Sequence, residues 1–350
     1  TTIGRLGAMN ASSAYALGFY GQNTTTGVMD SGAWLGNPDL DTPRITATHV
    51  TGVYGSSGNR YPQSIYATIQ KGVVPTAAEG QPFTEGEEFD VKGDYTLGFN
   101  DAHGTQVTGV IGAERNGEYG HGVAFKANVV VGNTGATDNN NYGPFQDYNY
   151  YFKGYKALAD AVNAGNGEYR GGMVNNSYGT NTKIFSSGGH RLTPDEMSEL
   201  LAGSGNYDRA SAAYAVTFSG DYSFLGLNDV PGADQYSTNP SAFEWEYMYF
   251  KLKYGDKPSF LDGAYDAVKG TNVILSWAAG NQDRGTPYLK GLYPYFHPEA
   301  EKNWLNAVGV MQTRGDNDQY MQATYCKAGL AKWWSMSGAC LLYTSDAADE

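Results

Sequence analysis

Three short segments of this chain place an acid, a base and an amide beside small residues. Asp30 lies in Gly-Val-Met-Asp-Ser-Gly (27–32), His103 lies in Asp-Ala-His-Gly-Thr-Gln-Val-Thr-Gly (101–109), and Asn281 ends Ala-Ala-Gly-Asn (278–281). A carboxylate can hold a histidine ring, the histidine can act as a general base, and a neutral amide can donate to a developing oxyanion. These are three of the four groups that acyl transfer through a nucleophilic Ser requires.

Each residue alone also has a simpler interpretation. Asp30 before Ser-Gly and Asn281 after Gly are residue types common in turns, and His103 could lie on the surface at a helix start. The three segments together, in this order, favour the catalytic interpretation. The other histidines have no motif around them, and we expect structural roles for each of them: His49, His121, His190 and His297.

Five segments in one order resemble the subtilisin-like serine peptidases. Besides the three above, Val-Asn-Asn-Ser-Tyr-Gly (174–179) resembles the family's substrate strand, and Asn-Ala-Val-Gly-Val (306–310) resembles the strand after its oxyanion turn. Gln106 stands where the family has a second, non-catalytic His. The resemblance implies that Asp30, His103 and Asn281 are catalytic and that proteins or peptides are the substrates. It also implies a substrate-binding set of small and polar residues: Ser177, Tyr178, Gly179, Ala278, Ala279 and Gly280.

The segment that carries the family's nucleophile, Gly-Thr-Ser-x-Ala-x-Pro, does not occur in the sequence. Tyr343-Thr344-Ser345 lacks the Gly before the Thr and the Ala and Pro after the Ser, so it is not a substitute. Residues 340–350 back-translate into a sequence like a transposon-end adapter used for sequencing libraries. We therefore expect 1–339 to be an incomplete, inactive peptidase domain and 340–350 to be an artefact. The rival interpretation is a non-catalytic surface binding module on the same scaffold.

Composition limits the partners and the location of the protein. The 350 residues carry a net charge of −13 and are rich in Gly (47) and Tyr (28), which argues against nucleic acid and anionic membranes as partners. No apolar run is long enough to span a bilayer. The composition suits a secreted or bacterial cell-surface protein, and the resemblance to the subtilisin-like peptidases implies the passenger part of an outer-membrane autotransporter. No cofactor motif is recognisable, and calcium, common in the resembled family, is left without a site.

Strand and helix signals alternate along the chain and predict a doubly wound α/β fold with a mainly parallel sheet and helices on both faces. Sites in such folds lie at the carboxyl ends of strands, where Asp30, Ser177 and Asn281 fall. The direction in which the bulky Trp277 and Tyr178 point is left open. We predict strands at 26–29, 45–50, 128–131, 173–177 and 272–277, helices at 104–112, 151–164, 194–202, 243–253 and 260–268, and irregular insertions at 52–99 and 180–258 within one domain.

Overall fold

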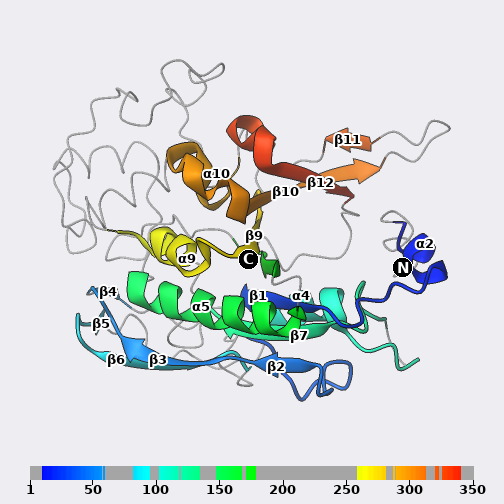
Figure 1. The fold of residues 1–350 in the computed structure, drawn as a ribbon, viewed down its shortest axis with the longest axis horizontal. Coiled ribbons are helices and arrows are strands. Elements are labelled where there is room, and N and C mark those ends of the chain that lie inside the picture. The colour runs from blue at the N-terminus through cyan, green and yellow to red at the C-terminus, as the bar shows by residue number, and fades with distance from the viewer. Residues whose placement is uncertain are drawn as a thin grey trace, which may run out of the picture.

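An eight-stranded, mainly parallel sheet forms the centre of the fold in the computed structural model (Figure 1). The strand order is β11-β10-β9-β8-β1-β7-β2, and β12 pairs with β10. This order and the helices on both faces confirm the predicted doubly wound α/β class.

The structure describes residues 10–56, 58–59, 82–94, 102–117, 120–134, 147–167, 171–178, 258–280, 287, 289–312, 320–322 and 325–339. The strands of the sheet are β1 (Thr25–Asp30), β2 (Ile45–Ala47), β7 (Asn128–Asn133), β8 (Gly171–Asn176), β9 (Asn272–Ala278), β10 (Trp304–Gln312), β11 (Tyr320–Gln322) and β12 (Ser335–Ala339).

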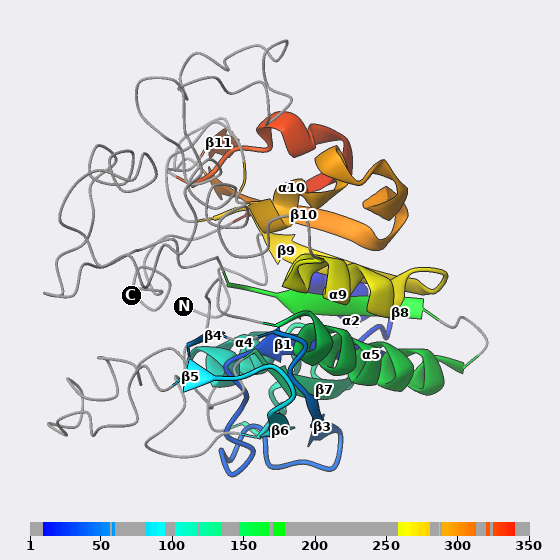
Figure 2. The same ribbon diagram turned by 90° about the vertical axis from the view of Figure 1, so that its left-hand side faces the viewer.

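Different helices cover the two faces of the sheet (Figures 1 and 2). On one face α5, α9 and α10 enclose the larger core, which includes Met29, Val174 and Trp277. On the other face α4 packs on β1 and β7, over Val28 and Val129. The helical segments are α2 (Ala11–Ala16), α4 (His103–Gly112), α5 (Tyr148–Gly165), α9 (Phe260–Val268) and α10 (Leu289–Phe296), with 3-10 turns η3 (Pro298–Asn303) and η4 (Gly329–Trp334).

The order of strands in the sheet changes direction at β1, and the candidate site lies at this switch point. β1 lies between β7 and β8 and runs parallel to both, and β7 and the short β2 occupy one side of it. The later strands β8, β9 and β10 follow in order on the other side. In open α/β sheets, ligands bind outside the carboxyl ends of the strands at such a switch point. Asp30 is the last residue of β1.

The prediction of one strand over 45–50 was wrong, because the chain leaves the sheet at Thr48. The Thr48 N–H donates to the carbonyl of Val131 at 2.8 Å, and β3 (His49–Val53) then pairs with β6 (Glu88–Lys92) in a separate antiparallel sheet. These strands also correct the irregular insertion predicted at 52–99. A second pair joins β4 (Gly58–Asn59) and β5 (Pro82–Phe83). The predicted helices at 194–202 and 243–253 lie outside the described residues.

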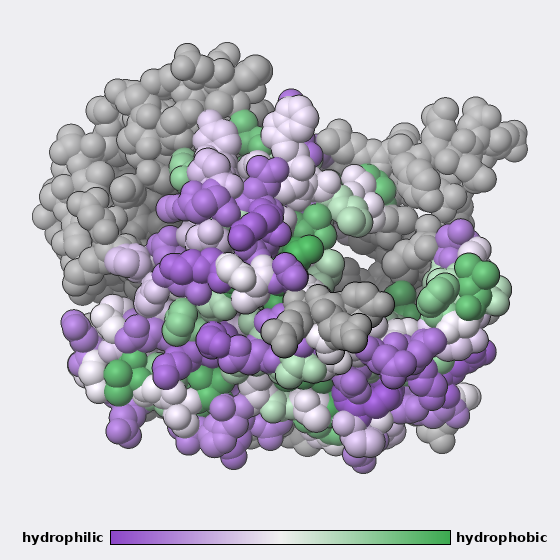
Figure 3. Space-filling model, viewed as in Figure 1, coloured by the Kyte–Doolittle hydropathy of each residue, from purple (hydrophilic) through white to green (hydrophobic). Residues whose placement is uncertain are grey.

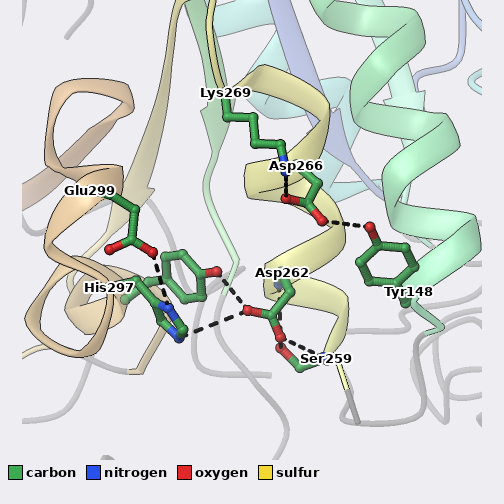
Figure 4. Close-up of polar contacts among 8 residues, drawn as sticks. Tyr148, Ser259, Asp262, Asp266, Lys269, His297 and Glu299 are labelled. Carbon is green, nitrogen blue, oxygen red and sulfur yellow. Dashed lines mark hydrogen bonds and ion pairs between the residues drawn. The ribbon is translucent and has the colours of Figure 1, made fainter.

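A cluster of polar side chains links α9 to α10 and α5 through hydrogen bonds (Figure 4). Ser259 and Asp262 form a capping box at the start of α9, and the Tyr293 hydroxyl of α10 donates to Asp262 Oδ1 at 2.6 Å. Asp266 accepts from the Tyr148 hydroxyl of α5 at 2.6 Å. Burial, followed by the hydrogen bond to Asp266, raises the pKa of Tyr148 to about 12, so this hydroxyl remains a donor at neutral pH.

On the face seen in Figure 3, the described residues are mostly hydrophilic, with an apolar group over α2 and the residues that follow it. Leu17 and Phe19 are exposed in this segment, and Trp333 and Met336 are exposed at η4 and β12. No helix in the described ranges is long and apolar enough to cross a membrane.

Candidate active site

Asp30 is fully buried at the carboxyl end of β1 and accepts hydrogen bonds from two directions. Its Oδ1 accepts from the Ser31 N–H and from His103 Nδ1, both at 2.8 Å. Its other oxygen, Oδ2, is also buried and has no hydrogen-bond partner among the described residues. The fold thus brings Asp30 and His103 into hydrogen-bond contact across 73 positions of sequence.

His103 is held at the first turn of α4 in an orientation suited to a base. An ionised carboxylate can only accept, so the bond to Asp30 places the proton of the neutral ring on Nδ1 and leaves Nε2 as the basic nitrogen. The side chain is 12% exposed, so the ring is largely shielded from solvent. This is the arrangement in which a histidine can take a proton from a nucleophile while the acid stabilises the imidazolium.

The start of α4 is locked against the end of β1 by Ser31 and Gly104. The Ser31 hydroxyl accepts from the Gly104 N–H at 3.0 Å, which satisfies one of the unpaired donors at the helix start. A Cβ on Gly104 would lie 2.1 Å from the carbonyl oxygen of Gly32, so only glycine permits this approach. The role of Ser31 was not predicted, although Ser31 and Gly104 are the small residues that directly follow Asp30 and His103 in the two motifs and so could have indicated the close approach.

The register of β1, β8 and β9 decides which residues share the face of Asp30. Val28 pairs with Asn175, and Asn175 pairs with Ser276, so the side chains at these positions lie on one face. Asp30 and Ala278, two residues further along β1 and β9, lie on that face. Asn175 Nδ2 donates to the Ser177 hydroxyl at 2.8 Å, which keeps Ser177 on the same side. We call this side, the side of α4, the cleft face.

Tyr178 and Trp277 point to the opposite face, into the core, which settles the direction left open by the sequence. Trp277 pairs with Asn176 and is fully buried, with its ring stacked on Trp304 at 5.3 Å between centroids. Tyr178 is 3% exposed and packs its ring edge against Trp277. Only the backbone of Tyr178 can contribute to a substrate wall on the cleft face.

The second wall continues from β9 into a turn that is tied to neighbouring segments. The Ala279 N–H donates to the carbonyl of Ala307 at 2.9 Å, and the Gly280 carbonyl accepts from the Cys326 N–H at 3.0 Å. Gly280 has φ of +118°, a conformation that favours glycine. Asn281 follows this residue directly and, like Gly179, lies outside the described residues.

The model of the Subtilase family, peptidase S8, matches residues 21–347. The chain belongs to the subtilase family. A segment of 70 residues is 33% identical to serotype-specific antigen 1 of Mannheimia haemolytica, covering 20% of this subtilase and 7% of the antigen.

Solved structures with similarity to this subtilase are also proteases. Fervidolysin from Fervidobacterium pennivorans, a keratinolytic enzyme related to subtilisin, is 13% identical with a TM-score of 0.35, over 91% of this chain and 29% of that one. The nisin leader peptidase of Lactococcus lactis is 14% identical with a TM-score of 0.34, over 87% and 61%. The subtilase chain thus spans less than two thirds of each of these relatives.

The other histidines that the structure describes have partners of their own. His49 Nε2 lies 2.5 Å from Asp90 Oδ1 on β3 and β6, and His121 Nδ1 donates to the Gly122 carbonyl at 2.8 Å. His297 bridges Asp262 and Glu299 at 3.8 and 3.5 Å (Figure 4). His190 lies outside the described residues. In the described part of the chain no three His, Cys, Asp or Glu side chains gather as metal ligands, so calcium remains an expectation without a site.

Proposed function

We propose that this subtilase is a serine endopeptidase that hydrolyses proteins through an acyl-enzyme, with Asp30 and His103 as acid and base. The observation that carries the proposal is the 2.8 Å bond between Asp30 Oδ1 and His103 Nδ1 at the carboxyl end of β1. Burial of Asp30 supports it, because a carboxylate withdrawn from water interacts more strongly with a developing imidazolium. Membership of a serine peptidase family gives the reaction class.

In the proposed mechanism His103 Nε2 removes the proton of a serine hydroxyl as its oxygen attacks the substrate carbonyl. The ring then carries a positive charge that Asp30 stabilises through Nδ1. Asn281, next after Gly280, is proposed to donate its side-chain N–H to the oxyanion. His103 gives its proton to the leaving amine. Water then attacks the acyl-enzyme, with His103 taking the proton of the water and giving it to the departing serine oxygen. The proposed nucleophile is the Ser of a Gly-Thr-Ser segment, which the 350 residues do not contain.

The substrate is proposed to be an extended protein segment that binds along the cleft face between the ends of β8 and β9. Ser177 and Gly179 would form one wall, with Tyr178 contributing its backbone, and Ala278, Ala279 and Gly280 the other. Small side chains let a peptide backbone approach closely and pair as an added strand. The protein is proposed to act outside the cell or at the bacterial surface, as an autotransporter passenger; the likeness to a protein named as a serotype-specific antigen supports this.

A second candidate function is favoured by one sequence observation. The chain carries no Gly-Thr-Ser segment, so a subtilase scaffold used only for binding at the cell surface would have the same sequence as far as it is given. The residue that the complete gene encodes at the position of the nucleophile separates the two functions.

The test is expression of the complete reading frame, followed by labelling with a fluorophosphonate probe and a casein hydrolysis assay. We expect one probe adduct on the Ser of the Gly-Thr-Ser segment and turnover that His103→Ala abolishes. Residues 1–350 alone should show neither. A gene with another residue in place of that Ser would favour the binding module, and an adduct on a serine within 1–350 would show that the nucleophile has been misassigned.

A further inference from the structure

A chain of buried hydroxyl groups lies behind the two candidate walls, on the face of the sheet opposite the cleft face. Tyr151 and Tyr155 come from α5, and Asn176 and Tyr178 come from the end of β8; each is at most 3% exposed. The Tyr155 hydroxyl lies 2.7 Å from that of Tyr178 and 2.5 Å from Asn176 Oδ1. The Tyr151 hydroxyl lies 3.4 Å from that of Tyr178.

The hydrogen bonds of this chain have one direction. Asn176 Nδ2 donates to the carbonyls of Val174 at 3.0 Å and Ser276 at 3.1 Å, so Oδ1 is the acceptor of the amide. Tyr155 must then donate to Asn176, and because a hydroxyl has one proton, Tyr155 accepts from Tyr178. The sequence of donors is therefore Tyr178, Tyr155 and Asn176, and it ends on the backbone of β9 at Ser276.

The chain ends where the two walls begin. Asn176 and Trp277 form the last register pair between β8 and β9, and Ser177 and Ala278 are the next residues of the two segments. The bond from Asn176 Nδ2 to the Ser276 carbonyl crosses from β8 to β9 at this point. Through Tyr155, α5 therefore holds a side-chain link that adds to the backbone pairing of the two strand ends.

The hydroxyls of Tyr155 and Tyr178 keep their protons over the whole pH range in which a peptidase works. Burial raises the pKa of Tyr155 and of Tyr178 well above the usual value, and the negative charge of the nearby Asp30 adds to the effect. Both hydroxyls therefore remain donors, and the direction of the chain does not change with pH.

We propose that Tyr155 and Tyr178 are positioning residues that fix the separation of the two substrate walls through Asn176. The inference rests on the proposed peptidase function for its effect on substrate, but its structural part concerns β8 and β9 alone. Trp277 stacks on Trp304 in the core, and its Nε1 makes no hydrogen bond among the described residues. Asn176 therefore provides the directional side-chain link between the two strand ends, in addition to their backbone pairing.

The substitutions that test this are Tyr155→Phe and Tyr178→Phe, each of which removes one oxygen and keeps the ring. Tyr155→Phe removes both the donor to Asn176 and the acceptor for Tyr178, so its effect should exceed that of Tyr178→Phe. The matched control is Tyr148→Phe, which removes a hydroxyl from the same helix that is bonded to Asp266 instead. All are made in the protein expressed from the complete reading frame.

Two measurements separate a positioning role from a general contribution to stability. Hydrogen exchange of the amides in 171–178 and 272–280 should be about tenfold faster in Tyr155→Phe and unchanged in Tyr148→Phe, because a lost buried hydrogen bond opens these strand ends locally. With an extended peptide substrate, KM should rise about fivefold to tenfold and kcat should change little, since walls hold ground state and transition state alike.

Each outcome decides a different point. Equal exchange in Tyr155→Phe and Tyr148→Phe would overturn the proposal whether or not the protein is a peptidase. Faster exchange at the strand ends in a protein that hydrolyses no peptide would leave the structural link standing and refute the proposed function. Faster exchange with unchanged KM in an active enzyme would refute the role in substrate binding.

Discussion

The two sides of the candidate cleft use their side chains in opposite ways. On the acid–base side, formed by β1 and α4, the side chains of Asp30 and His103 lie on the cleft face and contact each other. On the wall side, formed by β8 and β9, the large side chains of Tyr178 and Trp277 are turned into the core behind the sheet. Among the described residues, the proposed chemistry therefore depends on side chains on the acid–base side and mainly on the position of the backbone on the wall side. Substitutions on the two sides should differ in kind.

The largest effect is expected from Asp30→Asn on the acid–base side. The amide cannot hold His103 in the same tautomer or stabilise an imidazolium, so kcat should fall on the order of 10⁴-fold, about 5.5 kcal/mol, with KM nearly unchanged. The measurement is steady-state hydrolysis of a peptide by the protein of the complete reading frame. Asp160→Asn, which removes an exposed carboxylate from α5, is the control and should stay within about twofold of the wild type. A loss below about tenfold in Asp30→Asn would contradict the assignment of Asp30.

The next largest effect is expected from Trp277→Ala on the wall side, and it should be on stability. Trp277 is fully buried between Trp304 and Tyr178, so truncation should lower the free energy of unfolding by about 3–5 kcal/mol. Trp333→Ala is the matched control: Trp333 is 76% exposed, and its loss should change stability by about 0.5 kcal/mol at most. Urea unfolding followed by far-UV circular dichroism gives both values. Equal losses in the two variants would show that Trp277 does not lie in the core.

The two sides also differ in how far the sequence predicts them. Asp30 and His103 could be chosen as candidate acid and base because each stands in a motif at the end of a strand or the start of a helix, and these ends converge in a doubly wound sheet. The directions in which the side chains of Tyr178 and Trp277 point could not be predicted, because alternation fixes them only relative to their own strand. The missing fact was the pairing of Val28 with Asn175, which joins segments far apart in sequence.

The same reason explains the errors in the fold. The predicted 45–50 strand splits at Thr48, where the N–H still bonds to Val131 but the carbonyl accepts from Gly93; these are tertiary contacts that no local pattern contains. Residues 260–268 and 272–277 were predicted almost to the residue; in the structure a Ser259–Asp262 capping box begins this helix, and an apolar strand follows it. Local signals therefore predicted elements well, and their partners poorly.

A smaller effect on the acid–base side is expected from Gly104→Ala. The new Cβ would meet the backbone oxygen of Gly32, which cannot move as a side chain can, so the free energy of unfolding should fall by about 1–3 kcal/mol. Gly109→Ala is the control on the same helix. Nothing lies within 4 Å of its added Cβ, and stability should rise by about 0.5–1 kcal/mol because Ala favours the helix. Thermal and urea unfolding of the two variants should therefore shift in opposite directions, and a shift in one direction for both would refute the close approach.

The smallest expected effect is the loss of the ion pair at the far end of α4, and it depends on pH. Arg44 Nη2 lies 3.1 Å from Glu114 Oε2, and this hydrogen bond is the main cause that holds the pKa of Glu114 below its usual value. A carboxyl with a lowered folded pKa adds stability above its unfolded pKa of about 4.3, and this stability is lost as pH falls through the folded pKa.

Glu114→Gln should thus lower the free energy of unfolding by about 0.5–1 kcal/mol at neutral pH. Well below the folded pKa the variant and the wild type should be equally stable, because protonated Glu114 no longer pairs with Arg44. Glu301→Gln, an exposed change on η3, controls for the net charge. Urea midpoints measured from neutral to acid pH should converge for Glu114→Gln, and a constant difference would show that the charge of Glu114 contributes nothing to holding α4 in place.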